Sequence, residues 1–379
     1  MKKKSLFCLF IVFALLVFCF SFCSYAPCFA SSSPYTSAKS MVVIETKNNT
    51  ILYSKNENEK LPMASTTKII TAITVIDNCK NLDEVIKIPK EATLVEGSSI
   101  YLREGEELTI RELLYGLMLQ SGNDAATALA IKIGGSVEGF AMLMNKQIEK
   151  CGAINTHVVN PHGLDAKEHY TTAYDLAKIT SYALKNEDFR EIVSCKKYVT
   201  KESQNTKQRV LNNKNKLLNS LEGCVGVKTG YTSRAGRCLV SACLRGELET
   251  VCVVLNCGPM FEESAALLNL SHSEYENHMV FPDYNYVANI PVEGGVLNEV
   301  KVYSKKGYSF VIKKDMKNLI RVEYDYPNIL RAPVLKDQKV GTVRVFYENN
   351  LIFEENLFTI EPVDSIIINS KLKDILERW

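Results

Sequence analysis

The sequence has almost no excess of charge of either sign. Its formal net charge is +2 over 379 residues, and three of the basic residues form the run Lys2–Lys4 at the N-terminus. A near-neutral chain has no electrostatic footprint for nucleic acid, so we expect no nucleic-acid partner. The spacing of cysteine and histidine is not typical of a metal site, and no internal repeat is evident. Hydrophobic residues make up 46% of the chain, which predicts a sizeable buried core without a metal.

The one long apolar run lies at the N-terminus, where Leu6–Phe22 follows the basic run Lys2–Lys4. Small residues come next, and then the polar run Ser31–Ser33. This order predicts an export signal over residues 1–30, cleaved after Ala30. The apolar run is near the lower limit for crossing a bilayer, so an uncleaved anchor stays open, as does lipoprotein processing at Cys28.

Cysteine is plentiful, with 12 residues in the chain, but four of them lie in the predicted signal. An even number of cysteines in an exported chain permits disulfides. Several of the remaining ones, however, lie in apolar, strand-like runs, where a free thiol behaves as a small hydrophobe. We therefore expect mostly free thiols at the eight positions Cys79, Cys151, Cys195, Cys224, Cys238, Cys243, Cys252 and Cys257.

The apolar pattern alternates between helical and strand-like periods in the first two thirds of the chain. Helices interleaved with antiparallel strands predict an α+β domain, which we place at residues 31–275. Its expected elements are a β-hairpin at 41–54, a helix after Pro62, two helices within 108–132 broken around 120–123, a helix at 171–186, and strands from Cys238 to Leu255.

The composition changes near residue 280. Short strand-like runs separated by turn residues predict a small all-β module over residues 280–362. After Pro362 the period becomes helical again, and we expect an amphipathic helix over 363–379 that lies on a membrane surface. Packing of this helix on the β module is the alternative. The apolar face of the predicted helix is formed by Ile368, Leu372, Ile375, Leu376 and Trp379.

The first motif that could carry catalytic chemistry is Ser65-Thr66-Thr67-Lys68, directly before a predicted apolar helix. Residues i and i+3 share one helix face, so the amine of Lys68 can reach the hydroxyl of Ser65. A serine becomes a good nucleophile when a neighbouring base accepts its proton, and a lysine of lowered pKa can be that base. Alone the pattern is weak, because a serine before a helix is more often its cap.

The second motif is Ser121-Gly122-Asn123. Ser121 can relay a proton to a leaving amine, and the amide of Asn123 can hold the lysine and donate to a substrate carbonyl. In isolation a helix-capping turn is equally plausible.

The third motif is the stretch Gly226–Thr232, which contains a Lys-Thr-Gly sequence. Lys228 would supply a positive charge for a substrate carboxylate, and Thr229 would hydrogen-bond to the same group. Gly230 has no side chain, so an extended substrate can approach the strand edge closely. The alternative is a strand edge with a solvated lysine.

Together, S-x-x-K, S-x-N and K-T-G in this order are the signature set of penicillin-binding proteins and serine β-lactamases. Longer stretches resemble the low-molecular-weight D-alanyl-D-alanine carboxypeptidases, serine peptidase family S11. The resemblance covers nearly the whole chain and implies a transpeptidase-like α+β domain followed by a small β-sandwich. The stretches that carry it are residues 62–72, 121–126, 160–164, 169–173 and 228–232.

The resemblance also implies roles for the residues of the motifs. Ser65 would form an acyl-ester, Lys68 would be its general base, and Ser121 would relay protons. The backbone N–H groups of Ser65 and Tyr231 would form the oxyanion hole. The residues implied to bind substrate are Asn123, Lys228, Thr229, Gly230 and Tyr231.

The implied reaction is removal of the terminal D-alanine from peptidoglycan stem peptides ending in D-Ala-D-Ala. Water then hydrolyses the acyl-enzyme, no metal or organic cofactor takes part, and β-lactam antibiotics such as penicillin acylate Ser65. The implied location is the outer face of the cytoplasmic membrane or the cell wall, as a peripheral protein.

A basic residue that assists at the substrate carboxylate is harder to assign. Relatives often carry one in the strand after the turn at Arg245-Gly246, but here the residues are Leu248-Glu249-Thr250. Arg234 or Arg237 is the candidate substitute, with plain surface charge as the alternative.

Two histidines, His162 and His169, look like a catalytic pair on paper. We expect them to be structural, because Lys68 already fills the role of base.

Three other functions stay open at this point. A serine β-lactamase usually needs a glutamate for deacylation, and Asn160–Leu164 offers no acid at the expected place. A non-catalytic wall-binding scaffold would tolerate the loss of Ser65. A transpeptidase differs only in whether an amine or water reaches the acyl-enzyme.

Overall fold

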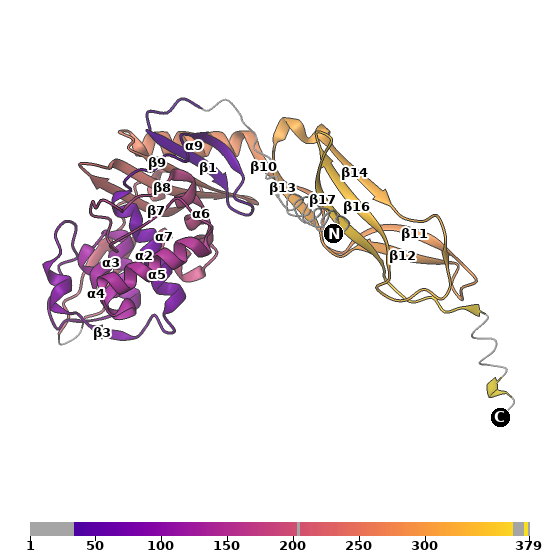
Figure 1. The fold of residues 1–379 in the computed structure, drawn as a ribbon, viewed down its shortest axis with the longest axis horizontal. Coiled ribbons are helices and arrows are strands. Elements are labelled where there is room, and N and C mark those ends of the chain that lie inside the picture. The colour runs from indigo at the N-terminus through magenta and orange to yellow at the C-terminus, as the bar shows by residue number, and fades with distance from the viewer. Residues whose placement is uncertain (1–33, 203–204, 367–374, 378–379) are drawn as a thin grey trace, which may run out of the picture. The chain divides into compact units, whose positions relative to one another are not determined.

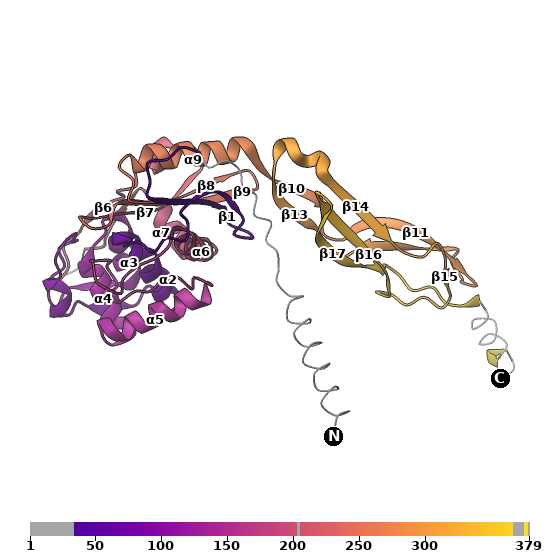
Figure 2. The ribbon, with the colours of Figure 1, turned by 45° about the horizontal axis from the view of Figure 1, so that its top comes forward.

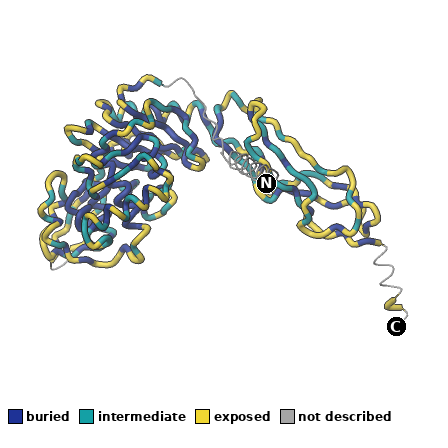
Figure 3. Tube along the Cα trace, viewed as in Figure 1, coloured by how far each residue is buried: buried dark blue, intermediate teal, exposed yellow. Residues whose placement is uncertain are grey.

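The computed structural model describes residues 34–202, 205–366 and 375–377. Their contacts divide the chain into two compact units (Figure 1). Of the described residues, the first unit holds those up to Cys243 together with Glu249–Leu268, and the second holds Leu244–Leu248 and those from Asn269 onwards. Each unit has a sheet and a buried apolar core of its own (Figure 3).

The first unit is built on a five-stranded sheet in the order β2-β1-β9-β8-β7. Strands β1 and β9 are buried over nearly their whole length, as expected for runs such as Met41–Ile44 and Val251–Leu255 that are apolar on both faces. Figure 2 shows α9 along one face of this sheet and α6 and α7 on the other. The strands are β1 (Ser40–Glu45), β2 (Ile51–Lys55), β7 (Cys224–Thr232), β8 (Gly236–Arg245) and β9 (Leu248–Leu255).

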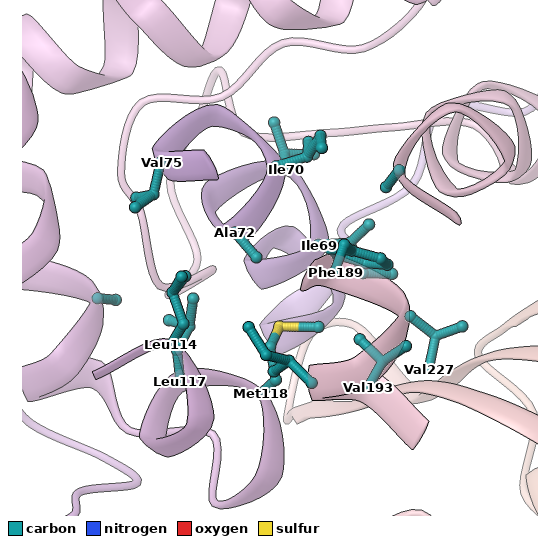
Figure 4. Packing of buried hydrophobic residues seen from close by; sticks show 14 of the residues in the cluster. Ile69, Ile70, Ala72, Val75, Leu114, Leu117, Met118, Phe189, Val193 and Val227 are labelled. Atoms are coloured by element: carbon teal, nitrogen blue, oxygen red, sulfur yellow. The ribbon is translucent and has the colours of Figure 1, made fainter. Parts of the chain in front are cut away.

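Helix α2 (Lys68–Asn78) is the centre of the first unit, because its residues from Lys68 to Ile76 are all buried. Figure 4 shows its apolar side chains beside those of α3, α7 and β7. The surrounding helices are α3 (Ile110–Leu119), α4 (Asn123–Gly134), α5 (Val137–Lys150), α6 (Ala173–Leu184), α7 (Glu187–Ser194), α8 (Leu217–Ser220) and α9 (Met260–Glu274), with the 3₁₀ turns η1 (Ala64–Thr67) and η2 (Lys90–Leu94).

Local sequence sets where several of these helices begin and end. Thr109 and Glu112 form a capping box at the start of α3, and Ser136 and Thr172 cap α5 and α6 through their hydroxyls. Gly135 ends α4 in the left-handed conformation that favours glycine. Two short strand pairs complete the unit: β3 (Val85–Lys87) with β4 (Glu107–Thr109), and β5 (Lys197–Val199) with β6 (Val210–Asn212).

The second unit is all-β after the end of α9. Its six-stranded sheet has the order β14-β16-β17-β12-β11-β15, and β10 pairs with β13 beside it. The main apolar core includes Phe281, Ile290 and Val302. The elements are β10 (Tyr275–Phe281), β11 (Asn285–Glu293), β12 (Glu299–Ser304), β13 (Tyr308–Lys313), η3 (Lys314–Leu319), β14 (Ile320–Asp325), β15 (Leu330–Arg331), β16 (Lys339–Tyr347) and β17 (Asn350–Thr359).

The predicted fold class, α+β followed by an all-β part, is confirmed. The expected hairpin at 41–54, the two helices within 108–132 and the helix at 171–186 are present as β1–β2, α3–α4 and α6. The exact domain limits 31–275 and 280–362 stay predictions. The predicted signal over 1–30 lies outside the described residues, and so does most of the predicted helix over 363–379. At the start of that range, Val363 and Ser365 form β-bridges with Val334 and Gly295 instead of a helical turn.

By length and composition, no single helix in the described ranges could span a membrane; only α4 and α5 taken together pass that test, and they are bent by 84°. All eight cysteines of the described chain are free thiols, in agreement with the sequence-based expectation.

Candidate active site

Ser65 and Lys68 lie one helical turn apart at the junction of η1 and α2. The amine Nζ of Lys68 donates a hydrogen bond to Oγ of Ser65 over 3.1 Å. Ser65 caps neither turn: the residue that precedes η1 is Met63 and the one that precedes α2 is Thr67. Ala64, directly before Ser65, has a φ of 48°, so the backbone leading into the serine is in the left-handed region.

Lys68 is completely buried and makes two further hydrogen bonds. Its Nζ donates to Oδ1 of Asn123 over 2.7 Å and to the carbonyl oxygen of His162 over 2.6 Å. Burial holds the pKa of Lys68 well below its usual range, and the nearby charges of Lys228 and Lys214 act in the same direction. In its neutral form the amine has two N–H groups, which the oxygens of Asn123 and His162 accept, and one lone pair, which can take the proton of the Ser65 hydroxyl.

Asn123 begins α4 and is held from its other side as well. Its amide Nδ2 donates to the carbonyl oxygen of Glu96 over 2.6 Å, and its backbone N–H donates to that of Ser98 over 2.7 Å. Gly97 has a φ of 92°, and a Cβ there would lie 2.7 Å from Nδ2 of Asn123. Residue 97 therefore has to be glycine for this close approach.

Ser121 lies in the turn between α3 and α4, with a φ of 65°. Its Oγ is buried and has no hydrogen-bond partner among the described residues. The residue that precedes α4 is Gly122, and no side chain caps this helix, so capping does not explain the serine. A buried hydroxyl left unpaired costs about 1–3 kcal/mol, which a substrate group can recover by bonding to it.

Strand β7 packs directly against η1 through Gly230. A Cβ on Gly230 would lie 3.1 Å from the backbone atoms Met63 O, Ser65 N and Thr66 N. The K-T-G stretch thus lies beside the backbone N–H of Ser65. Thr229 is half-buried in this strand, and the Tyr231 side chain is 67% exposed.

Lys228 is the second buried lysine of the site. Its Nζ donates to the carbonyl oxygen of Thr229 over 2.9 Å. Burial lowers the pKa of Lys228 to about 7, with a smaller contribution from the charge of Lys214. Because the charge of Lys228 also lowers the pKa of Lys68, the two amines share one electrostatic environment.

Lys214 is a residue of this site that the sequence analysis missed. Its charge lowers the pKa of both Lys68 and Lys228. The residue itself is exposed, and partial desolvation lowers its own pKa. Its backbone N–H donates to the carbonyl oxygen of Leu119, at the end of α3. A lysine in a polar turn carries no distinctive sequence signal, so only the fold brings it to the site.

His162 and His169 contact residues of the site through hydrogen bonds and are neutral, in line with a structural role. Nδ1 of His169 accepts from the backbone N–H of Val159, so its Nε2 carries the proton and lies 2.8 Å from Oγ1 of Thr67. Burial lowers the pKa of His162 to about 3 and that of His169 to about 4.

The side chains of the candidate arginines make no hydrogen bond to this group of residues in the described chain. Arg237 donates to the carbonyl oxygen of Gly258 over 3.4 Å, and Arg234 lies exposed after β7. Glu249, in the place where a basic residue was sought, is bound by Arg190 through two bonds of 2.7 and 3.1 Å. The cation whose charge lowers the pKa of Lys228 is therefore Lys214 and not an arginine.

Two family descriptions match the chain. Residues 28–258 match the D-alanyl-D-alanine carboxypeptidase family, peptidase S11, and residues 275–365 match the C-terminal domain of penicillin-binding protein 5. The D-alanyl-D-alanine carboxypeptidase DacF of Bacillus subtilis is 31% identical over 90% of each chain. DacC of Escherichia coli is 31% identical over 88% of this chain and 86% of its own.

Solved structures show the same likeness. Penicillin-binding protein 5 from Haemophilus influenzae has a TM-score of 0.71 at 26% identity, covering 88% of this chain and all of its own. The Streptomyces K15 DD-transpeptidase has a TM-score of 0.61 at 34% identity, covering 64% of this chain and all of its own. The chain therefore belongs to the D-alanyl-D-alanine carboxypeptidase family, peptidase S11, and is a serine hydrolase of the low-molecular-weight penicillin-binding protein type.

Proposed function

We propose that this chain removes the terminal D-alanine from peptidoglycan stem peptides through an acyl-ester on Ser65. The observation that carries the proposal is the hydrogen-bonded group of Ser65, Lys68 and Asn123, in which a buried amine of lowered pKa lies 3.1 Å from the hydroxyl. Such an amine can act as a general base at neutral pH. The family assignment supports the same reaction.

The acylation step follows from this geometry. Lys68 accepts the proton of the Ser65 hydroxyl while Oγ attacks the carbonyl carbon of the penultimate D-alanine. The backbone N–H groups of Ser65 and Tyr231 stabilise the oxyanion, and Gly230 lets the substrate backbone come close to them. Lys68 then returns this proton to the departing amine through Ser121, whose hydroxyl has no partner in the described chain and gives up its own proton as it receives that of Lys68.

The carboxylate of the terminal D-alanine provides the counter-charge for Lys228. A carboxylate beside Lys228 raises the pKa of the amine again, so the ammonium form is present when substrate is bound. Thr229 adds a hydrogen bond from its hydroxyl. Departure of D-alanine leaves the acyl-ester, which water hydrolyses to regenerate Ser65.

The location proposed for the enzyme is the outer face of the cytoplasmic membrane. The apolar run Leu6–Phe22 supports export, and the helical pattern over residues 363–379 supports peripheral attachment to the membrane surface.

Mass spectrometry of the mature protein tests the proposal. We expect penicillin to add one covalent adduct on the peptide that contains Ser65, and D-alanine to be released from diacetyl-Lys-D-Ala-D-Ala. Ser65→Ala should abolish both, whereas Ser220→Ala, at an exposed position on α8, should abolish neither. Absence of both signals in folded wild-type protein would contradict the proposal.

The same experiment separates the alternatives. Rapid turnover of nitrocefin, without a long-lived adduct, would identify a β-lactamase. Transfer of the acyl group to an added amino acid in preference to water would identify a transpeptidase. Full biological function of Ser65→Ala would identify a scaffold.

A further inference from the structure

Tyr101 combines two features that packing does not explain. Its φ is 60°, in the left-handed region that is unfavourable for a tyrosine, and its side chain is 82% exposed. Residues held in such conformations persist only when their surroundings impose them, and they cluster at functional sites. Since the ring is almost fully in solvent, its contribution to the core does not account for its position.

One side of the backbone at Tyr101 is held by Asp124. This carboxylate accepts the backbone N–H groups of Ile100 and Leu102 over 3.0–3.1 Å and the hydroxyl of Ser99 over 2.5 Å. The same hydroxyl oxygen accepts the backbone N–H of Tyr101 over 2.8 Å. Asp124 follows Asn123 in the chain, so the anchor of Tyr101 belongs to the turn that carries the site.

The other side is held by Arg209. Its guanidinium donates to the carbonyl oxygens of Ile100 over 2.8 Å and of Tyr101 over 2.9 Å. Two bonds of 2.7 Å to Glu106 fix the guanidinium, and both side chains of this pair are largely buried. Tyr101 is thus fixed through both its N–H and its carbonyl group.

The segment that ends at Tyr101 is bound to the catalytic group itself. Glu96 and Ser98 accept hydrogen bonds from the side chain and backbone of Asn123, whose Oδ1 accepts from Lys68. The fixed backbone therefore presents an exposed ring on the segment that wraps the Ser121–Asn123 turn. We propose that Tyr101 is a specificity-determining residue, whose ring contacts an aromatic or aliphatic substituent on the acyl side of the substrate.

This inference rests on the proposed function, and it specifies which part of the substrate Tyr101 recognises, namely the acyl side. The acyl side stays attached to Ser65 after the leaving group departs, so its contact with Tyr101 acts on acylation by peptides and β-lactams alike. Benzylpenicillin and 6-aminopenicillanic acid are suitable probes, because they differ only in the phenylacetyl group.

The test measures the acylation rate constant of Ser65 for each compound by mass spectrometry. In Tyr101→Ala and Tyr101→Gly we expect the ratio of benzylpenicillin to 6-aminopenicillanic acid to fall about two- to tenfold. Tyr101→Phe, which keeps the ring, should retain the wild-type ratio. Tyr284→Ala is the matched control, because Tyr284 is also exposed and has a φ of 55° but lies in the second unit.

Thermal unfolding checks that the backbone is strained. Because glycine accepts the left-handed conformation, Tyr101→Gly should melt about 2–4 °C above Tyr101→Ala. Equal ratios in wild type and both variants, or equal melting of the two variants, would overturn the inference while leaving the proposed function intact. Failure of both compounds to acylate wild-type Ser65 would instead overturn the proposed function, and this inference with it.

Discussion

Two lysines of the active site are buried without a carboxylate bonded to their amines in the described chain. Lys68 and Lys228 bond to a hydroxyl, an amide and backbone carbonyls, which accept hydrogen bonds but carry no full charge. Protonation of either amine is therefore unfavourable in the folded protein. The site is built for chemistry at the expense of stability, which single substitutions can reveal.

The stability of the protein should depend on pH through Lys228. The pKa of Lys228 is about 7 in the folded protein and near 10.5 in the unfolded chain, so folding expels a proton between these values. Stability from this group rises with pH over that window and is lowest below pH 7. Lys228→Met should therefore be more stable than wild type at pH 7, by about 1–3 kcal/mol, and the advantage should shrink towards pH 10.

Urea unfolding at pH 7, 8.5 and 10 measures this difference. Lys201→Met, at an exposed position, is the control and should show no such trend. A constant difference between Lys228→Met and wild type at all three pH values would contradict the prediction.

At the level of residues, the sequence predicted the three motifs but not everything around them. The pairing of Ser65 with Lys68 could be predicted from the sequence, because the two residues are separated by one helical turn. The roles of Lys214 and Tyr101 could not be predicted. Lys214 reaches the site only through tertiary structure, and Tyr101 is notable only for its backbone conformation. Neither property can be read from residue type.

Among the elements, the contact between strand β7 and turn η1 sets the geometry of the nucleophile. At Gly230, a Cβ would lie 3.1 Å from the backbone nitrogens of Ser65 and Thr66 in η1 and from the carbonyl oxygen of Met63, which precedes η1. Backbone cannot move aside as a flexible side chain can. The added methyl group must therefore shift β7 or η1 by a few tenths of an ångström.

We expect Gly230→Ala to slow acylation of Ser65 by penicillin about tenfold or more, because small displacements of reacting groups are costly. Gly258→Ala is the matched control, since a Cβ at Gly258 has no atom within 4 Å. Stopped-flow acylation and circular dichroism measure rate and folding. A Gly230→Ala variant that reacts at the wild-type rate would show that the contact has no influence on the nucleophile.

Elements with strong periodicity and clear boundaries were predictable, and short ones were not. The strands β3 and β4 have three residues each, too few to show a period. Helix α5 could have been found, since Phe140, Met144 and Ile148 recur every four residues after the cap Ser136. Helix α9 has apolar residues on several sides, so its pattern gives little indication of a buried face.

At the scale of the whole molecule, the first unit holds all the catalytic residues that we propose. The sequence indicated a second part through the change in composition near residue 280. It could not fix the strand order there, which depends on pairings between distant segments.

Removal of residues 367–379 should separate attachment from catalysis. We expect a chain that ends at Ile366, and so keeps the buried Val363, to be acylated by penicillin at the wild-type rate but to lose binding to vesicles that contain anionic lipid. Vesicle co-sedimentation measures the binding. In the full chain, Leu372→Asp on the predicted apolar face should have the same effect and Lys373→Gln off that face should not; equal vesicle binding by all four proteins would contradict surface attachment.

The free thiols of the first unit have a consequence for the conditions in which the protein can work. Burial raises the pKa of Cys252 and Cys257 to about 12, from an ordinary value of 9. Only the thiolate takes part in disulfide exchange, so this shift lowers its population about a thousandfold. These sulfur atoms are thus protected by their surroundings, and the folded protein can keep them reduced without depending on the redox state of its habitat.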